Sequence, residues 1–365
     1  MTGAPPAQIG RRPVLVTGGA GFIGSNLADR LAREGHDVHV YDVLARPGVE
    51  RNLAWLRARH PKRISATIAD IRDATALGDA ARDASAVFHM AAQVAVTTSL
   101  VDPVADFDTN VRATVALLEA LRRRPEPAPL IFASTNKVYG DLADIPLQLD
   151  GDAYLPVDPT VRQNGIGEER PLDFHTPYGC SKGAADQYVL DYARSFGVPT
   201  AVIRMSCVYG QRQMGTEDQG WVAHFAIRAI EGEPVSIYGD GAQVRDVLDV
   251  SDAVEAYLAA WRHIGAVSGT AFNLGGGPEN AISLRRLLVH LGELNGREVR
   301  TSFSDWRAGD QRYFVADTRR IRRVLGLGTP VGWRSGVAAL VDWLRGERGI
   351  EAEPQRRAIR AGARS

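Results

Sequence analysis

The stretch that decides the fold is Thr17-Gly18-Gly19-Ala20-Gly21-Phe22-Ile23-Gly24. It follows a short β-branched apolar run at Pro13–Thr17, typical of a buried parallel strand, and it opens a segment whose apolar positions recur at helical spacing. Gly18, Gly21 and Gly24 suit a sharp turn, a close approach of backbone N–H groups to a pyrophosphate, and tight packing of helix on strand. The helix N-terminus supplies partial positive charge at the same point. The stretch therefore predicts a dinucleotide site.

The next expected strand, at 37–42, ends in Asp42. A carboxylate there is placed to accept hydrogen bonds from the hydroxyls of an adenosine ribose and would repel a 2′-phosphate. Val43 and Leu44 follow it, so NAD is favoured over NADP, although Arg46 is near enough to leave NADP open. Beyond the three glycines, the expected NAD contacts at this stage are Phe22, Ile23, Asp42, Asp70, Ile71, Ala91, Ala92, Gln93 and Ser134.

Strands and helices alternate along the first 205 residues. Further strands are expected at 64–68, 86–90, 130–133 and 200–205, and helices at 22–31, 52–59, 74–81, 104–123 and 181–196. Later segments mix a strand at 235–238 with helices at 220–231, 250–262 and 283–295. This order predicts an α/β fold, a Rossmann-type doubly wound parallel sheet with a smaller mixed α/β substrate domain.

The expected domain division follows from where that alternation loosens. We assign 11–208 and 238–275 to an NAD-binding Rossmann domain, and 209–237 and 276–345 to the smaller domain. The residues after Trp343 are rich in Arg and Glu and poor in large apolar side chains, so we expect a disordered tail at 346–365.

Tyr178 and Lys182 form a Tyr-x-x-x-Lys pair on one face of a predicted helix. A free tyrosine titrates near pH 10, and a neighbouring ammonium together with an oxidised nicotinamide favours its phenolate. Lys182 can also hydrogen-bond the nicotinamide ribose, so both residues join the expected NAD contacts. Thr135, at the end of the fifth strand, would share its hydroxyl with the substrate oxygen that Tyr178 deprotonates. We predict Thr135, Tyr178 and Lys182 to be catalytic.

The glycine stretch, Ser134-Thr135, the Tyr178/Lys182 pair and the run Tyr238–Asp246 together resemble the extended short-chain dehydrogenase/reductase family that acts on nucleotide sugars. The resemblance spans residues 12–345. It implies an isomerase with tightly bound NAD and a smaller domain that binds the sugar nucleotide. Four stretches are most similar to the branch that inverts C2 of CDP-linked dideoxyhexoses such as CDP-paratose: Gln93–Ser99, Ser134–Gly140, Leu172–Gln187 and Asp218–Trp221.

The residues after Thr135 separate related reactions. The family's 4,6-dehydratases carry Asp-Glu there, because elimination of water needs an acid and a base, and its UDP-glucuronate decarboxylases carry a Glu. This chain has Asn136 and Lys137, and neither can act as a carboxylate acid or base. The reaction left is oxidation of a sugar carbon followed by its re-reduction, which is an epimerisation. The resemblance implies that the carbon is C2 and that the intermediate is a 2-keto sugar. Asn136 and Lys137 could contact the sugar or pack the strand end.

The resemblance also implies substrate contacts. The family's pyrophosphate and nucleotide contacts map onto Arg245 and onto Arg312 or Asp310, and arginine suits bidentate phosphate recognition. Trp221 could instead be a core anchor. Cys207 stands where most of the family has Asn, so amide recognition is not expected there. The full expected substrate-binding set is Thr97, Asn136, Lys137, Gln219, Trp221, Arg245 and Arg312.

Composition excludes several classes of partner. Forty-three basic residues balance forty-three acidic ones, so no global field favours nucleic acid or an anionic membrane. The first ten residues lack the regions of a signal peptide, and no run of about 18 apolar residues occurs. The two cysteines and eight histidines show no metal-ligand spacing, so we expect no disulfide and no metal. His175 and His224 are interpreted as packing or hydrogen-bonding residues. A cytoplasmic enzyme is expected.

Two alternatives remain open. One is a nucleotide-sugar C4 epimerase or another ketosugar-forming member of the family. The other, from a different class, is a non-catalytic NAD-binding protein, since a fold can persist after its chemistry is lost. The resemblance further implies a homodimer or homotetramer built through helices at 104–123 and 181–196. The nucleotide base, the deoxy pattern of the sugar and the direction of the reaction are not determined by the sequence.

Overall fold

A seven-stranded parallel sheet forms the centre of the molecule. The structure is a computed structural model that describes residues 12–307 and 309–350. The strand order is β12-β8-β5-β4-β1-β2-β3, and every neighbouring pair is parallel. The predicted doubly wound fold is confirmed. Its strands are β1 (Val14–Thr17), β2 (Val38–Asp42), β3 (Ile64–Ile68), β4 (Ala86–His89), β5 (Leu130–Thr135), β8 (Thr200–Met205) and β12 (Thr270–Leu274).

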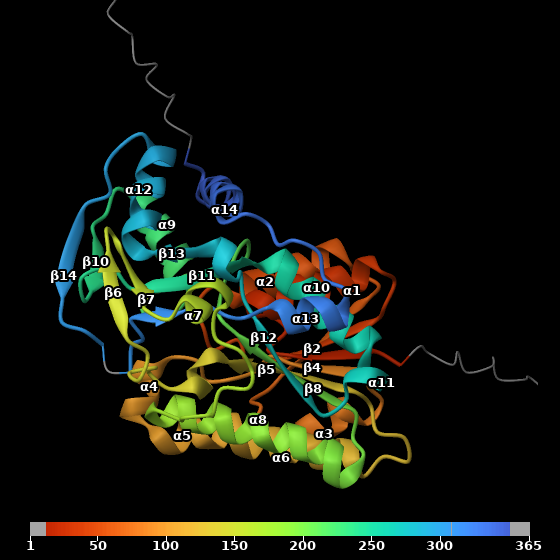
Figure 1. The fold of residues 1–365 in the computed structure, drawn as a ribbon. Helices are drawn as coiled ribbons and strands as arrows, with labels where there is room; N and C mark the ends of the chain where they lie inside the picture. Colours follow the sequence, from red (N-terminus) through yellow and green to blue (C-terminus); the bar gives the residue numbers. More distant parts are fainter. Residues whose placement is uncertain (1–11, 308, 351–365) are drawn as a thin grey trace, which may run out of the picture.

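Helices cover both faces of this sheet (Figure 1). Because parallel strands need crossover connections, each face becomes a separate buried core. The helices over one face are α1 (Phe22–Arg33), α2 (Val49–Arg59), α10 (Val250–Arg262) and α13 (Arg319–Leu325), with α11 (Ile264–Val267) at the edge. Those over the other face are α3 (Ala74–Arg82), α5 (Pro103–Phe107), α6 (Ala113–Arg122) and α8 (Thr176–Phe196), with α4 (Val96–Val101) beside them.

The remaining elements form a smaller part beyond the carboxyl ends of the strands (Figure 1). Here β11 (Val244–Asp249) pairs with β9 (Cys207–Tyr209), β13 (Ala281–Ser283) and β15 (Tyr313–Phe314). Two further pairs are β10 (Val235–Tyr238) with β14 (Thr301–Ser304), and β6 (Leu147–Asp150) with β7 (Ala153–Pro156). The helices are α7 (Pro159–Asn164), α9 (Trp221–Glu231), α12 (Leu284–Asn295) and α14 (Trp333–Arg348), and the last three enclose a third core.

The domain division stays a prediction. Within the segment 238–275, α10 and β12 join the large sheet, whereas β11 pairs with strands of the smaller part.

The larger differences from the sequence-based boundaries affect two helices near Tyr178 and the C-terminal helix. The helix expected at 104–123 is divided by a π-helical turn at Asp108–Arg112, because Asn110 there turns its amide toward Gln93 and Ser181. The helix α8 begins at Thr176 rather than 181, with Pro177 suited to its first turn. Tyr178 and Lys182 therefore lie in the first two turns of one helix.

The C-terminal helix also extends past its expected end. Helix α14 continues to Arg348, with Leu344 buried and the Arg345 guanidinium donating to the Leu294 carbonyl, so the expectation of a frayed chain after Trp343 is wrong for these residues. The rest of the expected tail, from 351, lies outside the described residues.

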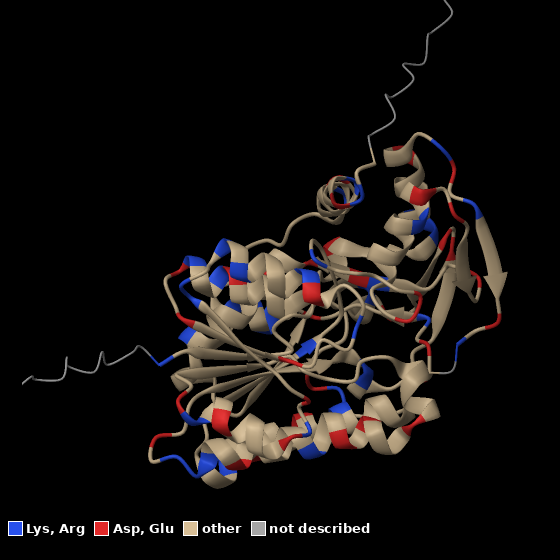
Figure 2. Cartoon of the chain, turned by 180° about the vertical axis from the view of Figure 1, so that it is seen from behind, with Lys and Arg blue, Asp and Glu red and all other residues tan. Residues whose placement is uncertain are grey.

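Acidic and basic side chains alternate over the helices on both sides of the sheet (Figure 2). This distribution agrees with the balanced composition. Over the described part of the chain, every helix is too short or too polar to cross a membrane.

Candidate active site

A cavity of about 950 Å³ lies at the carboxyl ends of the parallel strands. β1 has β2 on one side and β4 on the other, so the strand order reverses at this point and leaves a crevice between the loops that follow the strands. Every expected cofactor residue and every expected catalytic residue lines the cavity. So do the expected substrate contacts, except Arg312. Its guanidinium lies instead over the rings of Tyr154 and Trp306, at 5.5 and 5.2 Å.

The three glycines after β1 serve different purposes. Gly18 has a φ of +66°, and a Cβ there would lie 2.7 Å from the Ala91 nitrogen, so it permits the turn and the close approach of the β4 loop. A Cβ on Gly24 would lie 2.2 Å from the Gly18 carbonyl oxygen, so this glycine is needed for helix packing. A Cβ on Gly21 would meet only that oxygen among the described residues, at 3.1 Å, and would otherwise enter the cavity. Gly21 therefore leaves room for a ligand.

Asp42 is fixed at the end of β2. Its two carboxylate oxygens accept from the backbone N–H groups of Ala20 and Leu44, at 3.0 and 2.9 Å. The side chain is thus held against the glycine loop while it lines the cavity. Arg46 also lines the cavity. Burial lowers its pKa, and the smaller effects of Tyr178 and Asp42 oppose this change. In the sequence, Arg46 was considered only because it could favour NADP. In the structure it lines the cavity, close enough to Asp42 and Tyr178 for both to act on its charge.

Tyr178, Thr135 and Lys182 all line the cavity. The Thr135 hydroxyl lies near the Tyr178 phenol and lowers its pKa, and both side chains are buried. Lys182 is 3% exposed, and its ammonium lies 4.1 Å from the centre of the Phe132 ring. It makes no hydrogen bond to any residue that the structure describes. A buried ammonium without a partner needs a ligand to satisfy it.

The electrostatics of this pair differ from the expectation. Burial raises the pKa of Tyr178, Thr135 and Arg46 lower it, and Asp106 raises it further. Burial lowers the pKa of Lys182 to about 7, against the opposing effects of Asp186 and Asp106. The sequence suggested that a neighbouring ammonium lowers the pKa of Tyr178, but burial has the larger effect and raises it. The phenol therefore needs additional positive charge nearby to ionise.

Asn136 and Lys137 are both tied to the loop at 307–312. The Asn136 amide donates to Gln311 Oε1 at 3.1 Å and its carbonyl accepts from Thr135, while Gln311 Nε2 donates to the Gly140 carbonyl. Lys137 Nζ donates to the Gly309 carbonyl at 3.0 Å. Burial, with Arg245 nearby, lowers the pKa of Lys137 to about 8. Asn136 thus orients Thr135, and Lys137 lines the cavity as a partly buried cation.

A group of charged residues lines the outer part of the cavity. The Arg245 guanidinium pairs with Asp310 at 2.7 Å. Arg307 lies over the Tyr238 ring at 3.8 Å and donates to the Glu217 carbonyl at 3.1 Å. The loop carrying Gln219 is thereby joined to the 307–312 loop. Neither Arg307 nor Glu217 was selected from the sequence, because isolated charged loop residues carry no pattern.

Trp221 and Cys207 adjoin each other on the cavity wall. The Trp221 ring packs edge-on against Phe225 at 5.6 Å and also faces the cavity, so it both anchors the third core and lines the site. The indole lies beside the Cys207 thiol, whose pKa is raised by burial, and its Nε1 has no hydrogen-bond partner among the described residues. The chain therefore presents a thiol where an amide was considered.

The comparisons with known proteins agree with this geometry. The model of the NAD dependent epimerase/dehydratase family matches residues 14–275. The chain belongs to this family. It is 42% identical over 336 residues to a CDP-paratose 2-epimerase of Salmonella typhi, covering 90% of this chain and 98% of that protein. It is 34% identical over 332 residues to a UDP-glucose 4-epimerase of Mycolicibacterium smegmatis, covering 91% and 98%. Both relatives are isomerases.

A solved structure gives the same result for the fold. The Thermus thermophilus UDP-glucose 4-epimerase in complex with NAD superposes with a TM-score of 0.76 at 32% identity, covering 92% of this chain and 99% of that one. NAD is the cofactor of the family, and the cavity fits it on two counts. Gly21 leaves room where the backbone must approach a pyrophosphate, and Lys182 is a buried ammonium without a partner among the described residues.

Asn110 is a site residue of this family member that the sequence analysis missed. It lies in the π-helical turn, 1% exposed, and its amide donates to the Gln93 carbonyl and to Ser181 Oγ, at 3.0 Å each. It thereby joins the β4 loop to the catalytic helix. The feature that could have identified it is an Asn within the helix expected at 104–123. An Asn at such a position indicates a π-helical turn only when its hydrogen-bond partners are known.

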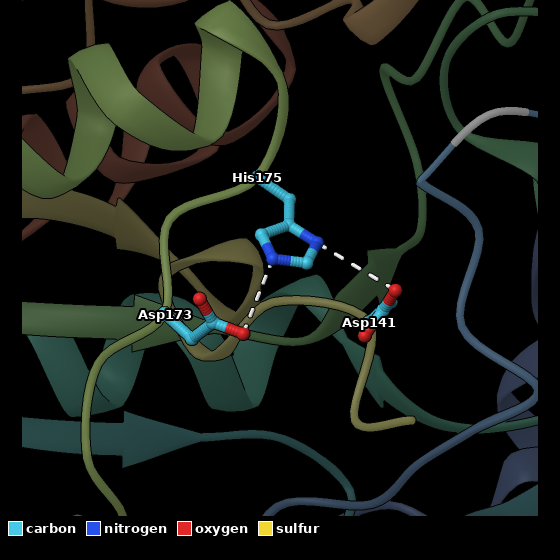
Figure 3. Close-up of side chains that lie close together, drawn as sticks. All are labelled: Asp141, Asp173 and His175. Atoms are coloured by element: carbon cyan, nitrogen blue, oxygen red, sulfur yellow. Dashed lines mark ion pairs between the residues drawn. The ribbon is translucent and has the colours of Figure 1, made fainter. Parts of the chain in front are cut away.

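His175 lies outside the cavity. Its ring nitrogens Nδ1 and Nε2 lie 3.6 Å from Asp141 and 3.2 Å from Asp173, as Figure 3 shows. These three residues are close enough to share an ion, but two of them are exposed and each ring nitrogen already faces a carboxylate. The interpretation of His175 as a hydrogen-bonding residue agrees with this arrangement.

Proposed function

We propose that this protein is an NAD-dependent nucleotide-sugar epimerase that inverts C2 of a CDP-linked deoxyhexose. The observation that carries the proposal is the hydroxyl pair of Tyr178 and Thr135 in one cavity with Lys182, which has no hydrogen-bond partner among the described residues. The position after Thr135 holds no carboxylate. Such a site can move a proton on and off a sugar hydroxyl, and it lacks the adjacent acid and base that elimination of water needs.

The chain's own residues carry the proton steps. The Tyr178 oxygen accepts the proton of the sugar hydroxyl, and Thr135 hydrogen-bonds the same sugar oxygen. Lys182, in its protonated form, stabilises the phenolate. A bound NAD would supply the hydride acceptor and donor for the sugar carbon. The keto sugar turns over between the two steps, so the hydroxyl re-forms with the opposite configuration when Tyr178 gives its proton back.

The choice of C2 rests on similarity and on the cations of the cavity. The 42% identity to a CDP-paratose 2-epimerase exceeds the 34% identity to a UDP-glucose 4-epimerase. Lys137 and Arg245 lie together, with Asp310 as the nearby carboxylate, so the group carries excess positive charge suited to a diphosphate. Since C2 adjoins the carbon that bears the diphosphate, a partly buried cation two residues after Thr135 is favourable for reaction there.

The test is a panel of CDP-, UDP-, GDP- and dTDP-sugars incubated with the pure protein and followed by proton NMR. We expect a CDP-sugar to change configuration at C2. A substrate deuterated at C2 should then react more slowly, whereas one deuterated at C4 should react at the normal rate. Epimerisation at C4, with an isotope effect only at that carbon, would establish the runner-up, a C4 epimerase. Binding of NAD with no turnover of any sugar would favour a non-catalytic NAD-binding protein.

We also propose that the protein forms a homodimer through α5, α6 and α8. Large apolar side chains lie exposed on α4, α5 and α8: Leu100, Val101, Val104, Phe107, Tyr188 and Phe196. A patch of this kind is unusual on a monomer. Sedimentation analysis should give twice the chain mass, and Val104→Glu should reduce it. A monomeric wild-type protein would contradict the proposal.

A further inference from the structure

Asp106 is a buried carboxylate that receives hydrogen bonds only from neutral groups. It is 1% exposed on α5, directly before the π-helical turn. Ser181 Oγ donates to one of its oxygens, and Gln93 Nε2 and Asn110 Nδ2 donate to the other, at 2.8 and 3.3 Å. No ion pair joins it to a cation in the part of the chain that the structure describes. A buried charge of this kind is costly unless a second charge compensates it.

The other carboxylate near Lys182 is already compensated. Asp186 is fully buried, and its two oxygens accept from the Arg204 guanidinium at 2.9 Å each. It also accepts from Ser134 Oγ at 2.7 Å. The charge of Asp186 is therefore largely neutralised by Arg204. Asp106 is the carboxylate near Lys182 that has no ion pair to another described residue.

Lys182 is a buried cation without an ion pair to any described residue. Its ammonium lies over the Phe132 ring, and the side chain lines the cavity. Ser181, which precedes it on α8, is the residue that Asp106 binds. Of the groups that face Lys182, Asp186 and Asp106 favour its charged form, and buried His89, with a pKa lowered to about 3 by burial, is neutral.

We propose that Asp106 is the buried counter-charge of Lys182, a positioning residue that holds the ammonium protonated behind the catalytic tyrosine. The inference rests on the proposed function, because the ammonium matters through Tyr178. It also has a consequence for the phenol. Arg46 and Asp106 are the charged groups that act on Tyr178, and Asp106 opposes its ionisation. The same carboxylate therefore sets the protonation of both members of the pair.

The Asp106→Asn variant isolates this charge, because the pocket accommodates a carboxamide. The new carbonyl oxygen can keep the hydrogen bonds from Gln93 and Asn110. The new amide can donate to Ser181 Oγ, whose own proton can turn to the Tyr178 carbonyl oxygen 3.2 Å away. Each hydrogen bond of the carboxylate thus keeps a counterpart in the variant, so its main effect is the loss of the charge.

The pH profile gives the test. Loss of the negative charge lowers the pKa of both Lys182 and Tyr178, so both limbs of the pH profile of kcat should move to lower pH. We expect both limbs to shift down by about one pH unit. The control is Asp108→Asn, which removes a carboxylate paired with Arg112 in the adjoining π turn and should leave both limbs in place.

A second readout does not depend on turnover. The near-ultraviolet absorbance of each holoenzyme, minus that of the same protein carrying Tyr178→Phe, reports the phenolate of Tyr178 alone. In the Asp106→Asn protein it should appear at lower pH than in the wild type. A reduced kcat with unmoved limbs and an unmoved phenolate titration would make Asp106 a packing residue only. If the wild type turns over no nucleotide sugar, the proposed function fails, and the absorbance titration still decides the role of Asp106.

Discussion

The glycine loop after β1 and the loop at 307–312 line the same cavity, and they were predictable to very different degrees. In the first, each residue acts through its own backbone, so three glycines at fixed spacing specified the turn, the opening and the helix packing. In the second, side chains act through partners far away in the sequence. Gln311 holds Asn136, Gly309 holds Lys137, and Arg307 meets Glu217. Local backbone motifs can therefore be predicted from the sequence, whereas networks of side chains from distant segments cannot.

The largest expected effect is on turnover and comes from Tyr178, which lines the same cavity as both loops. Tyr178→Phe removes the phenol oxygen that exchanges the sugar proton but keeps the ring in its buried place. Turnover should fall about 10³-fold, within the usual range for a general acid–base group. Bound NAD, measured after denaturing the purified protein, should stay at the wild-type level. Comparable turnover in the variant would show that another group performs the proton transfer.

The next prediction separates two glycines of the first region. Gly24→Ala places a Cβ 2.2 Å from the Gly18 carbonyl oxygen, so the variant should lose about 1–3 kcal/mol of unfolding free energy through overpacking. Gly21→Ala is the matched control. Its Cβ points into the cavity, so the variant should fold with near wild-type stability and retain less NAD. Chemical denaturation and NAD content measure the two outcomes, and equal behaviour of both variants would contradict the assignment.

A smaller effect is expected in the second region from Gln311→Leu. Gln311 is fully buried, and its loss leaves the Asn136 amide without its acceptor, so Asn136 no longer holds Thr135. An unsatisfied buried donor costs about 1–3 kcal/mol, and we expect kcat to fall about tenfold. The KM for the nucleotide sugar and the NAD content should change little. A raised KM with normal kcat would mean that Gln311 supports binding instead.

The smallest effect distinguishes two arginines of the same loop. Arg307 and Arg312 both lie over aromatic rings, but only Arg307 lines the cavity. Arg307→Ala should raise the KM of the nucleotide sugar about tenfold through loss of a charged contact, whereas Arg312→Ala should change it less than about twofold. Steady-state kinetics decide this pair. A large effect of Arg312→Ala would restore its sequence-based assignment as a substrate contact.

The sequence by itself determined the parallel sheet, the glycine loop, the acid at the end of β2 and the Tyr178/Lys182 pair. Each depends on neighbours within one strand–loop–helix unit or one helical turn, so spacing along the chain is enough to define it. The balance of charges, which needs no geometry, was also readable.

Only the tertiary structure decided that Arg312 lies outside the cavity, that Arg46, Asn110 and Arg307 belong to the site, and that burial raises the pKa of Tyr178. The physical reason is common to all of them. Desolvation, ion pairing and hydrogen bonding depend on distances between segments that are far apart in the chain, by 175 positions for Asn136 and Gln311. No pattern within a single segment encodes those distances.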